Sequence, residues 1–171
     1  MKVKIILGIF GVILILFIIS QLFFLNSQRN IETYAFKIID TYETIQIRQY
    51  EASLFTSVEI PSNNYRKTST KGFSVLAGYI FGGNDKKEKI AMTSPVAMSL
   101  KDSTTMMFLV PKKYTRDNLP TPNDSSIEFK DEPEKKVAAI SFGGWANDLK
   151  IASFKKKLIE VLDSKAIQCT Y

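Results

Sequence analysis

Residues 42–60, YETIQIRQYEASLFTSVEI, decide how this chain of 171 residues begins its fold. Apolar and polar side chains alternate along the first half, where Ile45 and Ile47 share one side. A period of two is typical of a half-buried β-strand. The second half, residues 52–60, is rich in β-branched and aromatic residues and ends at Pro61. The stretch therefore predicts two consecutive strands.

The pattern then changes to a helical period. Ser62 is a suitable N-cap, and apolar residues recur at helical spacing before Gly82 and Gly83 end the run. The members of this apolar stripe are Tyr65, Phe73, Leu76 and Ile80. We also expect strands at residues 35–40, 89–100, 105–111, 126–132 and 135–145, and a second helix at residues 147–164. This order predicts an α+β domain with two related halves.

The segment KIAMTSPVAM, residues 89–98, carries Met92 and Met98 on either side of Pro95. In a strand both methionines would lie on the same face, opposite a face of small residues. Because proline has no N–H to donate, we expect an edge strand or a bulge at Pro95. The methionines either fill an irregular core or lie beside a groove that the interrupted strand opens.

The first 29 residues form a separate segment. No charged residue occurs between Ile5 and Leu25, and 21 helical residues at about 1.5 Å each would cross the roughly 30 Å of a bilayer's hydrocarbon core. Bulky residues follow where a signal peptidase needs small ones, so an anchor is favoured over a cleaved signal. Lys2 and Lys4 favour a cytoplasmic N-terminus. The sequence thus predicts a single-pass membrane protein with residues 30–171 exported.

Composition excludes several classes of function. The chain has no histidine and one cysteine, which removes the commonest metal ligand and any intramolecular disulfide. Without Lys2, Lys4 and Arg29, 20 basic residues remain against 17 acidic ones, a net charge of +3 that does not indicate nucleic-acid binding. The glycine pairs lack the spacing of a phosphate loop, and no acid–base pair or nucleophile elbow is visible. We therefore expect no enzymatic activity.

Several motifs in register resemble the SOUL haem-binding protein family. They are YETIQIRQYEASLFTSV, GFSVLAGYIFGGND, KIAMTSPVAM, FLVPKKY, LPTPNDSSI and ISFGGW, and together they extend from Tyr34 to about Lys165. The resemblance implies a distorted antiparallel β-barrel flanked by two long helices. It also implies non-covalent binding of haem or another tetrapyrrole in a shallow apolar groove. Relatives continue with a further C-terminal strand, so we expect the domain of residues 30–171 to lack that strand.

In the family the groove lies beside the first long helix, which the resemblance places at residues 65–80. The implied contacts are apolar residues of that helix together with a basic residue that would hold the propionates. These candidates are Tyr65, Lys71, Phe73, Leu76 and Ala77. The histidine ligand proposed for some relatives has no counterpart here, so the resemblance assigns no ligand to iron. An alternative is an envelope scaffold or protein-interaction module of the same fold without a ligand.

Overall fold

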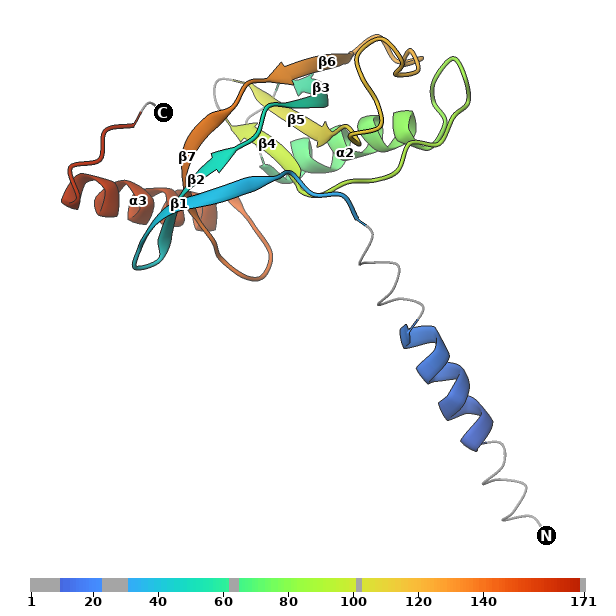
Figure 1. The fold of residues 1–171 in the computed structure, drawn as a ribbon, viewed down its shortest axis with the longest axis horizontal. Coiled ribbons are helices and arrows are strands. Elements are labelled where there is room, and N and C mark those ends of the chain that lie inside the picture. The colour runs from blue at the N-terminus through green and yellow to red at the C-terminus, as the bar shows by residue number, and fades with distance from the viewer. Residues whose placement is uncertain (1–9, 23–30, 62–64, 101–102, 170–171) are drawn as a thin grey trace. The chain divides into compact units, whose positions relative to one another are not determined.

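The computed structural model describes residues 10–22, 31–61, 65–100 and 103–169. The chain divides into two compact units, Met1–Glu32 and Thr33–Tyr171. The elements of the larger unit are β1 (Phe36–Tyr42), β2 (Ile45–Tyr50), β3 (Ser53–Ile60), α2 (Tyr65–Ile80), β4 (Val96–Leu100), β5 (Thr104–Leu109), β6 (Ile127–Glu132), β7 (Lys135–Ile140) and α3 (Asp148–Ser164) (Figure 1). The predicted α+β class is confirmed.

The prediction of a transmembrane helix is wrong. In the smaller unit the structure describes residues 10–22, which are helical. These thirteen described residues extend roughly 20 Å at about 1.5 Å each, which is less than the hydrocarbon thickness of a bilayer. Among the described residues, no helix has both the length and the apolar content to cross a membrane. The expected single-pass protein with an exported domain is overturned with it, although residues 5–9 and 23–25 of the predicted span lie outside the described residues.

The expected barrel is also not observed, because the described strands form two separate sheets. The three-stranded sheet has the order β1-β2-β7, and the four-stranded sheet has the order β4-β5-β3-β6. Two passages connect them, from β2 into β3 and from β6 into β7 (Figure 1). Tyr50 pairs with Lys135 on one side of the break, and Ser53 pairs with Glu132 on the other. Pro133 lies in the break and has no N–H to continue the ladder.

The expectation for Pro95 is confirmed. β4 begins at Val96, immediately after the proline, and it is an edge strand of the four-stranded sheet. Residues 90–95, which the predicted strand at 89–100 included, belong to no strand; Ser94 forms an isolated parallel bridge with Thr33, and the Ile90 N–H donates to the Ile80 carbonyl at 2.8 Å. The predicted cap at Ser62 lies outside the described residues. The cap of α3 is Asn147, whose side chain accepts a hydrogen bond from the Lys150 N–H at 2.9 Å.

The main core lies between α2 and one face of the four-stranded sheet. Leu76, Tyr79 and Ile80 of the helix pack with Met106 and other buried residues of the strands. The Tyr79 hydroxyl donates to the Pro120 carbonyl at 2.8 Å, so this buried polar group is satisfied. On the other face of the sheet lies a smaller cluster of Tyr34, Phe55 and Leu109.

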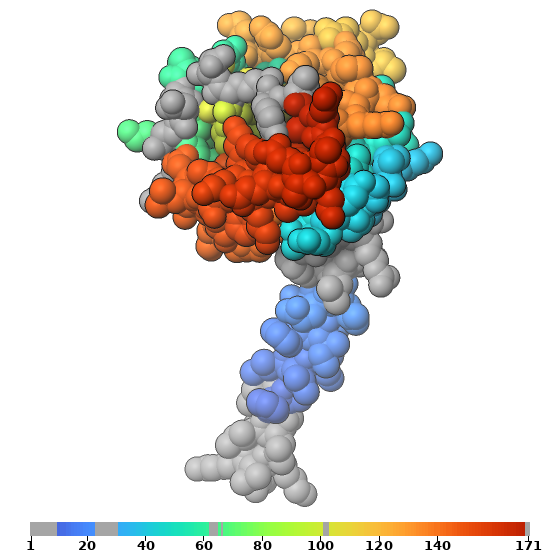
Figure 2. Space-filling view, turned by 90° about the vertical axis from the view of Figure 1, so that its left-hand side faces the viewer, coloured from blue at the N-terminus to red at the C-terminus, as the bar shows by residue number. Residues whose placement is uncertain are grey.

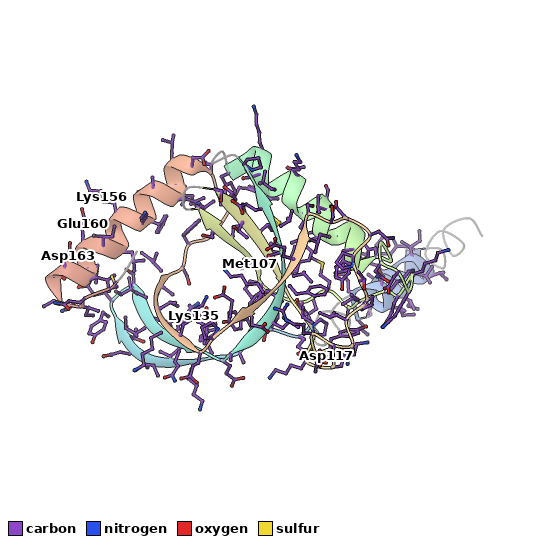
Figure 3. The ribbon with its side chains drawn as sticks, turned by 90° about the horizontal axis from the view of Figure 1, so that it is seen from above. Met107, Asp117, Lys135, Lys156, Glu160 and Asp163 are labelled. Atoms are coloured by element: carbon purple, nitrogen blue, oxygen red, sulfur yellow. The ribbon has the colours of Figure 1, made fainter. Side chains whose placement is uncertain are left out.

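The second helix covers its sheet less completely. Leu162 is the only α3 residue that is fully buried, and Leu149, which the sequence pattern would place inward, is 85% exposed. Figure 2 shows the face of the larger unit that α3 and the preceding chain occupy. Lys156 and Glu160 lie along the outer side of the helix (Figure 3) and form an exposed ion pair at 3.8 Å. The three-stranded sheet is therefore the more open of the two.

The close approach of α2 to its sheet predicts opposite effects for two glycines. A Cβ at Gly72 would lie 2.9 Å from Ile60 Cδ1 and 3.0 Å from Met106 Cβ, whereas a Cβ at Gly78 would meet nothing within 4 Å. Alanine is favoured over glycine in a helix by about 1 kcal/mol, but overpacking costs about 1–3 kcal/mol. We expect Gly72→Ala to lower the free energy of unfolding and Gly78→Ala to raise it, as measured by urea denaturation. Equal effects of the two substitutions would contradict the close packing at Gly72.

Tyr79 predicts a specific loss of stability at high pH. Burial raises the pKa of Tyr79 to about 12, and the nearby Tyr114, Asp85 and Glu88 add to the shift. Because this pKa lies above the unfolded value near 10, the stabilisation is complete below pH 10 and is lost as the pH rises toward 12. We expect Tyr79→Phe to flatten the decline in unfolding free energy between pH 10 and 12. A decline of the same slope in both proteins would refute the assignment.

Candidate functional site

Phe73 is the sequence-predicted site residue whose aromatic ring remains accessible. Its side chain is 39% exposed, and its ring contacts the Phe108 ring edge-on with centroids 5.4 Å apart. Val96 of β4 is the cross-strand partner of Phe108, and Met98 is the partner of Met106 in the same ladder. Cross-strand partners share one face of a sheet, so Val96 and Met98 lie on the side that α2 covers. We call Phe73, Val96 and Met98 the Phe73 surface.

Leu76 and Ala77 are buried beside Phe73. Leu76 is 0% exposed and belongs to the main core, so it contributes to packing and offers no surface to a ligand. Ala77 is 9% exposed and lies four residues after Phe73, on nearly the same side of the helix. The fold thus brings Phe73 and Ala77 together and directs Leu76 into the sheet.

Lys71 and Tyr65 lie apart from Phe73. Two helical residues correspond to a rotation of about 200°, so Lys71 projects on the opposite side of α2 from Phe73. Lys71 is exposed. Tyr65 begins α2 two turns before Phe73, and its backbone N–H donates to Asp148 Oδ1 at 3.1 Å, which links α2 to the start of α3. The structure therefore does not gather the five predicted residues into one pocket.

A cavity that the sequence did not predict lies between β7 and α3. Its volume is about 980 Å³, within the range of small-molecule pockets. Apolar side chains of both elements contribute to its lining, together with one lysine and one aspartate. The lining residues are Lys136, Val137, Ala138, Leu158, Leu162, Asp163, Ala166, Ile167, Gln168 and Cys169. Helical periodicity predicted the apolar side of α3, but it could not predict how far the helix would lie from β7.

Aromatic rings cluster where the two sheets meet. The Tyr34 ring lies 4.5 Å from the Tyr50 ring and 5.1 Å from the Phe55 ring, measured between centroids. The Tyr34 hydroxyl is buried and has no hydrogen-bond partner among the described residues. Burial raises the pKa of Tyr34, and the negative charge of Glu132 adds to the shift. Tyr34 therefore stays neutral over the physiological range of pH.

Glu132 carries the charge at the same junction. Its carboxylate pairs with Lys130 at 2.8 Å and also with Lys135, which lies where β6 passes into β7 (Figure 3). Burial opposes ionisation, but the hydrogen bonds from both lysines hold the pKa of Glu132 below its usual value. The carboxylate is therefore ionised and paired at neutral pH.

No cluster of three His, Cys, Asp or Glu side chains suited to a metal ion occurs within residues 10–22, 31–61, 65–100 and 103–169. Apolar and aromatic side chains instead provide the accessible surface beside α2 and the lining between β7 and α3. Small-molecule sites in proteins are lined predominantly by hydrophobic and aromatic side chains of this kind.

Comparison with known proteins defines the family. A model of the family described as SOUL heme-binding protein matches residues 31–171, so the chain belongs to the SOUL haem-binding protein family. Heme-binding protein 1 of Xenopus laevis is 29% identical over 119 residues, which are 65% of this chain and 62% of the relative. Heme-binding protein 2 of Homo sapiens is 29% identical over 135 residues, or 70% and 65% of the two chains. The match thus spans less than two thirds of either relative.

The difference between Phe73 and Leu76 can be measured as stability. Removing a fully buried leucine side chain costs about 2–5 kcal/mol, whereas a partly exposed ring on an aromatic contact contributes about 1 kcal/mol. We expect Leu76→Ala to lower the free energy of unfolding several times more than Phe73→Ala. Urea denaturation of both variants would show this difference. Equal losses would mean that Phe73 is a core residue and not an open surface.

Proposed function

We propose that this chain binds haem or a related tetrapyrrole without a covalent bond, at the Phe73 surface. The observation that carries the proposal is the exposed Phe73 ring, which rests on Phe108 beside Val96 in a member of a haem-binding family. A tetrapyrrole presents a broad apolar disc that prefers aromatic and aliphatic contacts. The names of the related proteins support the same class of ligand.

The residues present fit the apolar part of such a ligand. Phe73 offers an exposed ring, Val96 and Met98 extend the surface along β4, and Ala77 adds a small side chain on the same side of the helix. Met98 is flexible and adapts its shape to a flat partner. We infer that these side chains cover one face of the ligand and exclude water from it.

The basic contact implied for Lys71 needs a different arrangement. Lys71 and Phe73 project from opposite sides of α2, so a flat molecule lying on the Phe73 ring does not reach the Lys71 amine from that face. Lys71 and Tyr65 therefore lie outside the surface that we propose for the disc. When bound, haem would supply iron chemistry, and with no histidine in the chain we assign no protein ligand to the metal.

The proposal predicts similar affinity for a porphyrin with and without iron. Because the Phe73 surface contacts only the disc, haemin and protoporphyrin IX should bind within about threefold of each other, by absorbance and fluorescence titration. Phe73→Asp should weaken both at least tenfold, because binding would then bury a charge. Leu149→Asp is the control, since it places the same charge at an exposed apolar position on another helix. The absence of any Soret change would exclude haem binding.

Protein–protein interaction is the second candidate function. Trp145, which precedes α3, is 94% exposed, and Leu149 in the first turn of α3 is 85% exposed. Exposed tryptophans are enriched among the residues that dominate interfaces between proteins. A chain that shows no porphyrin binding but loses a protein partner on Trp145→Ser would support this function instead.

A further inference from the structure

Arg48 is a half-buried cation in the middle of the three-stranded sheet. It lies on the central strand β2, where Ile38 of β1 and Val137 of β7 are its two cross-strand partners. Among the described residues no carboxylate forms an ion pair with it, in contrast to Arg116, which pairs with Asp131 at 2.6 Å. A partly buried guanidinium normally gains a carboxylate or phosphate partner, because removing its charge from water is costly.

The guanidinium is nevertheless held in a fixed orientation. Its Nε and Nη2 atoms donate to Gln46 Oε1 at 2.9 and 2.7 Å, and its Cζ atom lies 4.6 Å from the centre of the Phe36 ring. The contacts with the Tyr50 and Ser141 hydroxyls are longer, at 3.4 Å each. One neutral acceptor thus satisfies the two short bonds, which leaves donor capacity for an anionic group. Such prior orientation reduces the entropy lost on binding.

Two different surroundings adjoin Arg48 on this sheet. Toward the β1–β2 turn there is a small cavity of about 170 Å³, lined mainly by hydroxyl and amide side chains, by Arg48 and by Glu43. In the opposite direction the same face of the sheet carries Phe36 and Ile38, which are 41% and 53% exposed. A polar hollow and an apolar strip therefore lie on either side of one oriented cation.

We propose that Arg48 binds the carboxylate of an amphipathic molecule whose apolar body lies on Phe36 and Ile38. The guanidinium would form charge-assisted hydrogen bonds with the carboxylate, and the exposed apolar side chains would cover the hydrocarbon part. The single negative charge of a carboxylate suits the site better than a phosphate dianion, because Glu43 lines the same small cavity. The carboxylate could belong to a fatty acid or to a tetrapyrrole propionate, which share this chemistry. The proposal does not depend on binding at the Phe73 surface.

The test follows the arginine side chain directly by NMR. The chain contains four arginines, so the Nε–Hε signal of Arg48 can be identified as the one missing from Arg48→Lys. We expect octanoate to shift this signal of the full chain in a saturable way and the uncharged octanamide to leave it unchanged. Equal shifts with both compounds, or no shift with octanoate, would overturn the proposal.

Substitutions of Ile38 provide a matched pair that leaves Arg48 in place. Ile38→Asp places a carboxylate on the cross-strand partner of Arg48, so it should occupy the guanidinium and weaken octanoate binding at least tenfold. Ile38→Asn has nearly the same shape as Ile38→Asp without the charge, so it loses the same apolar contact and should weaken octanoate binding much less than Ile38→Asp does. Ile38 is more than half exposed on an edge strand, so both variants should fold, as circular dichroism would check. Equal octanoate affinity in the two variants would refute the role of Arg48.

A competition experiment distinguishes the two sources of the carboxylate. If protoporphyrin IX displaces octanoate from Arg48 and its dimethyl ester does not, the carboxylate is a tetrapyrrole propionate. If neither displaces octanoate, the site serves a fatty acid. The effect of Phe73→Asp on porphyrin affinity is measured independently, so either proposal can fail without the other.

Discussion

The break in two neighbouring strands determines the architecture of the larger unit. β2 ends in the three-stranded sheet at Tyr50, and β3 begins in the four-stranded sheet at Ser53. The reverse passage runs from the end of β6 at Glu132 to the start of β7 at Lys135. The strands pair antiparallel without a register shift on both sides of the break. Pro133 prevents a continuous ladder between them, because it has no N–H to donate. The ion pair of Glu132 with Lys135 joins the two sides. Without this break, β2 with β3 and β6 with β7 would form one long antiparallel pair of strands in a single sheet.

The two sheets differ in how fully their helices cover them. α2 approaches its sheet so closely that only glycine fits at position 72, and it buries Leu76 and Tyr79 against the strands. α3 buries Leu162 and leaves a cavity beside β7. Apolar area that remains exposed contributes nothing to stability but remains available for a ligand. Functional surfaces are therefore expected at the margin of the first helix and across the open sheet.

Local patterns predicted the elements, and long-range packing explains the errors. β2 was predicted correctly because the alternation of Ile45 and Ile47 with polar residues is a local property of the sequence. The edge position of β4 was predicted correctly because it follows from the missing N–H of Pro95. The division into two sheets depends on pairing between residues about 80 positions apart, which no periodicity encodes. The apolar run at residues 5–25 indicated a membrane span, but no helix among the described residues is long and apolar enough to cross a membrane.

The candidate site was predictable in part for the same reason. The helical stripe placed Phe73 and Leu76 on one side of the helix, but the stripe is wider than the buried face, so it did not show that Phe73 is partly exposed and Leu76 is core. The close approach of the Gly72 backbone to the side chains of Ile60 and Met106 explains the difference between Phe73 and Leu76. It fixes the rotation of α2, and that rotation places Leu76 against the sheet and Phe73 at the margin, where the ring can rest on Phe108 but cannot pass beneath the helix. The exposure of Phe73 is thus a consequence of tight packing at the adjacent residue, and a ligand that covers the ring gains apolar contact without any rearrangement of the core.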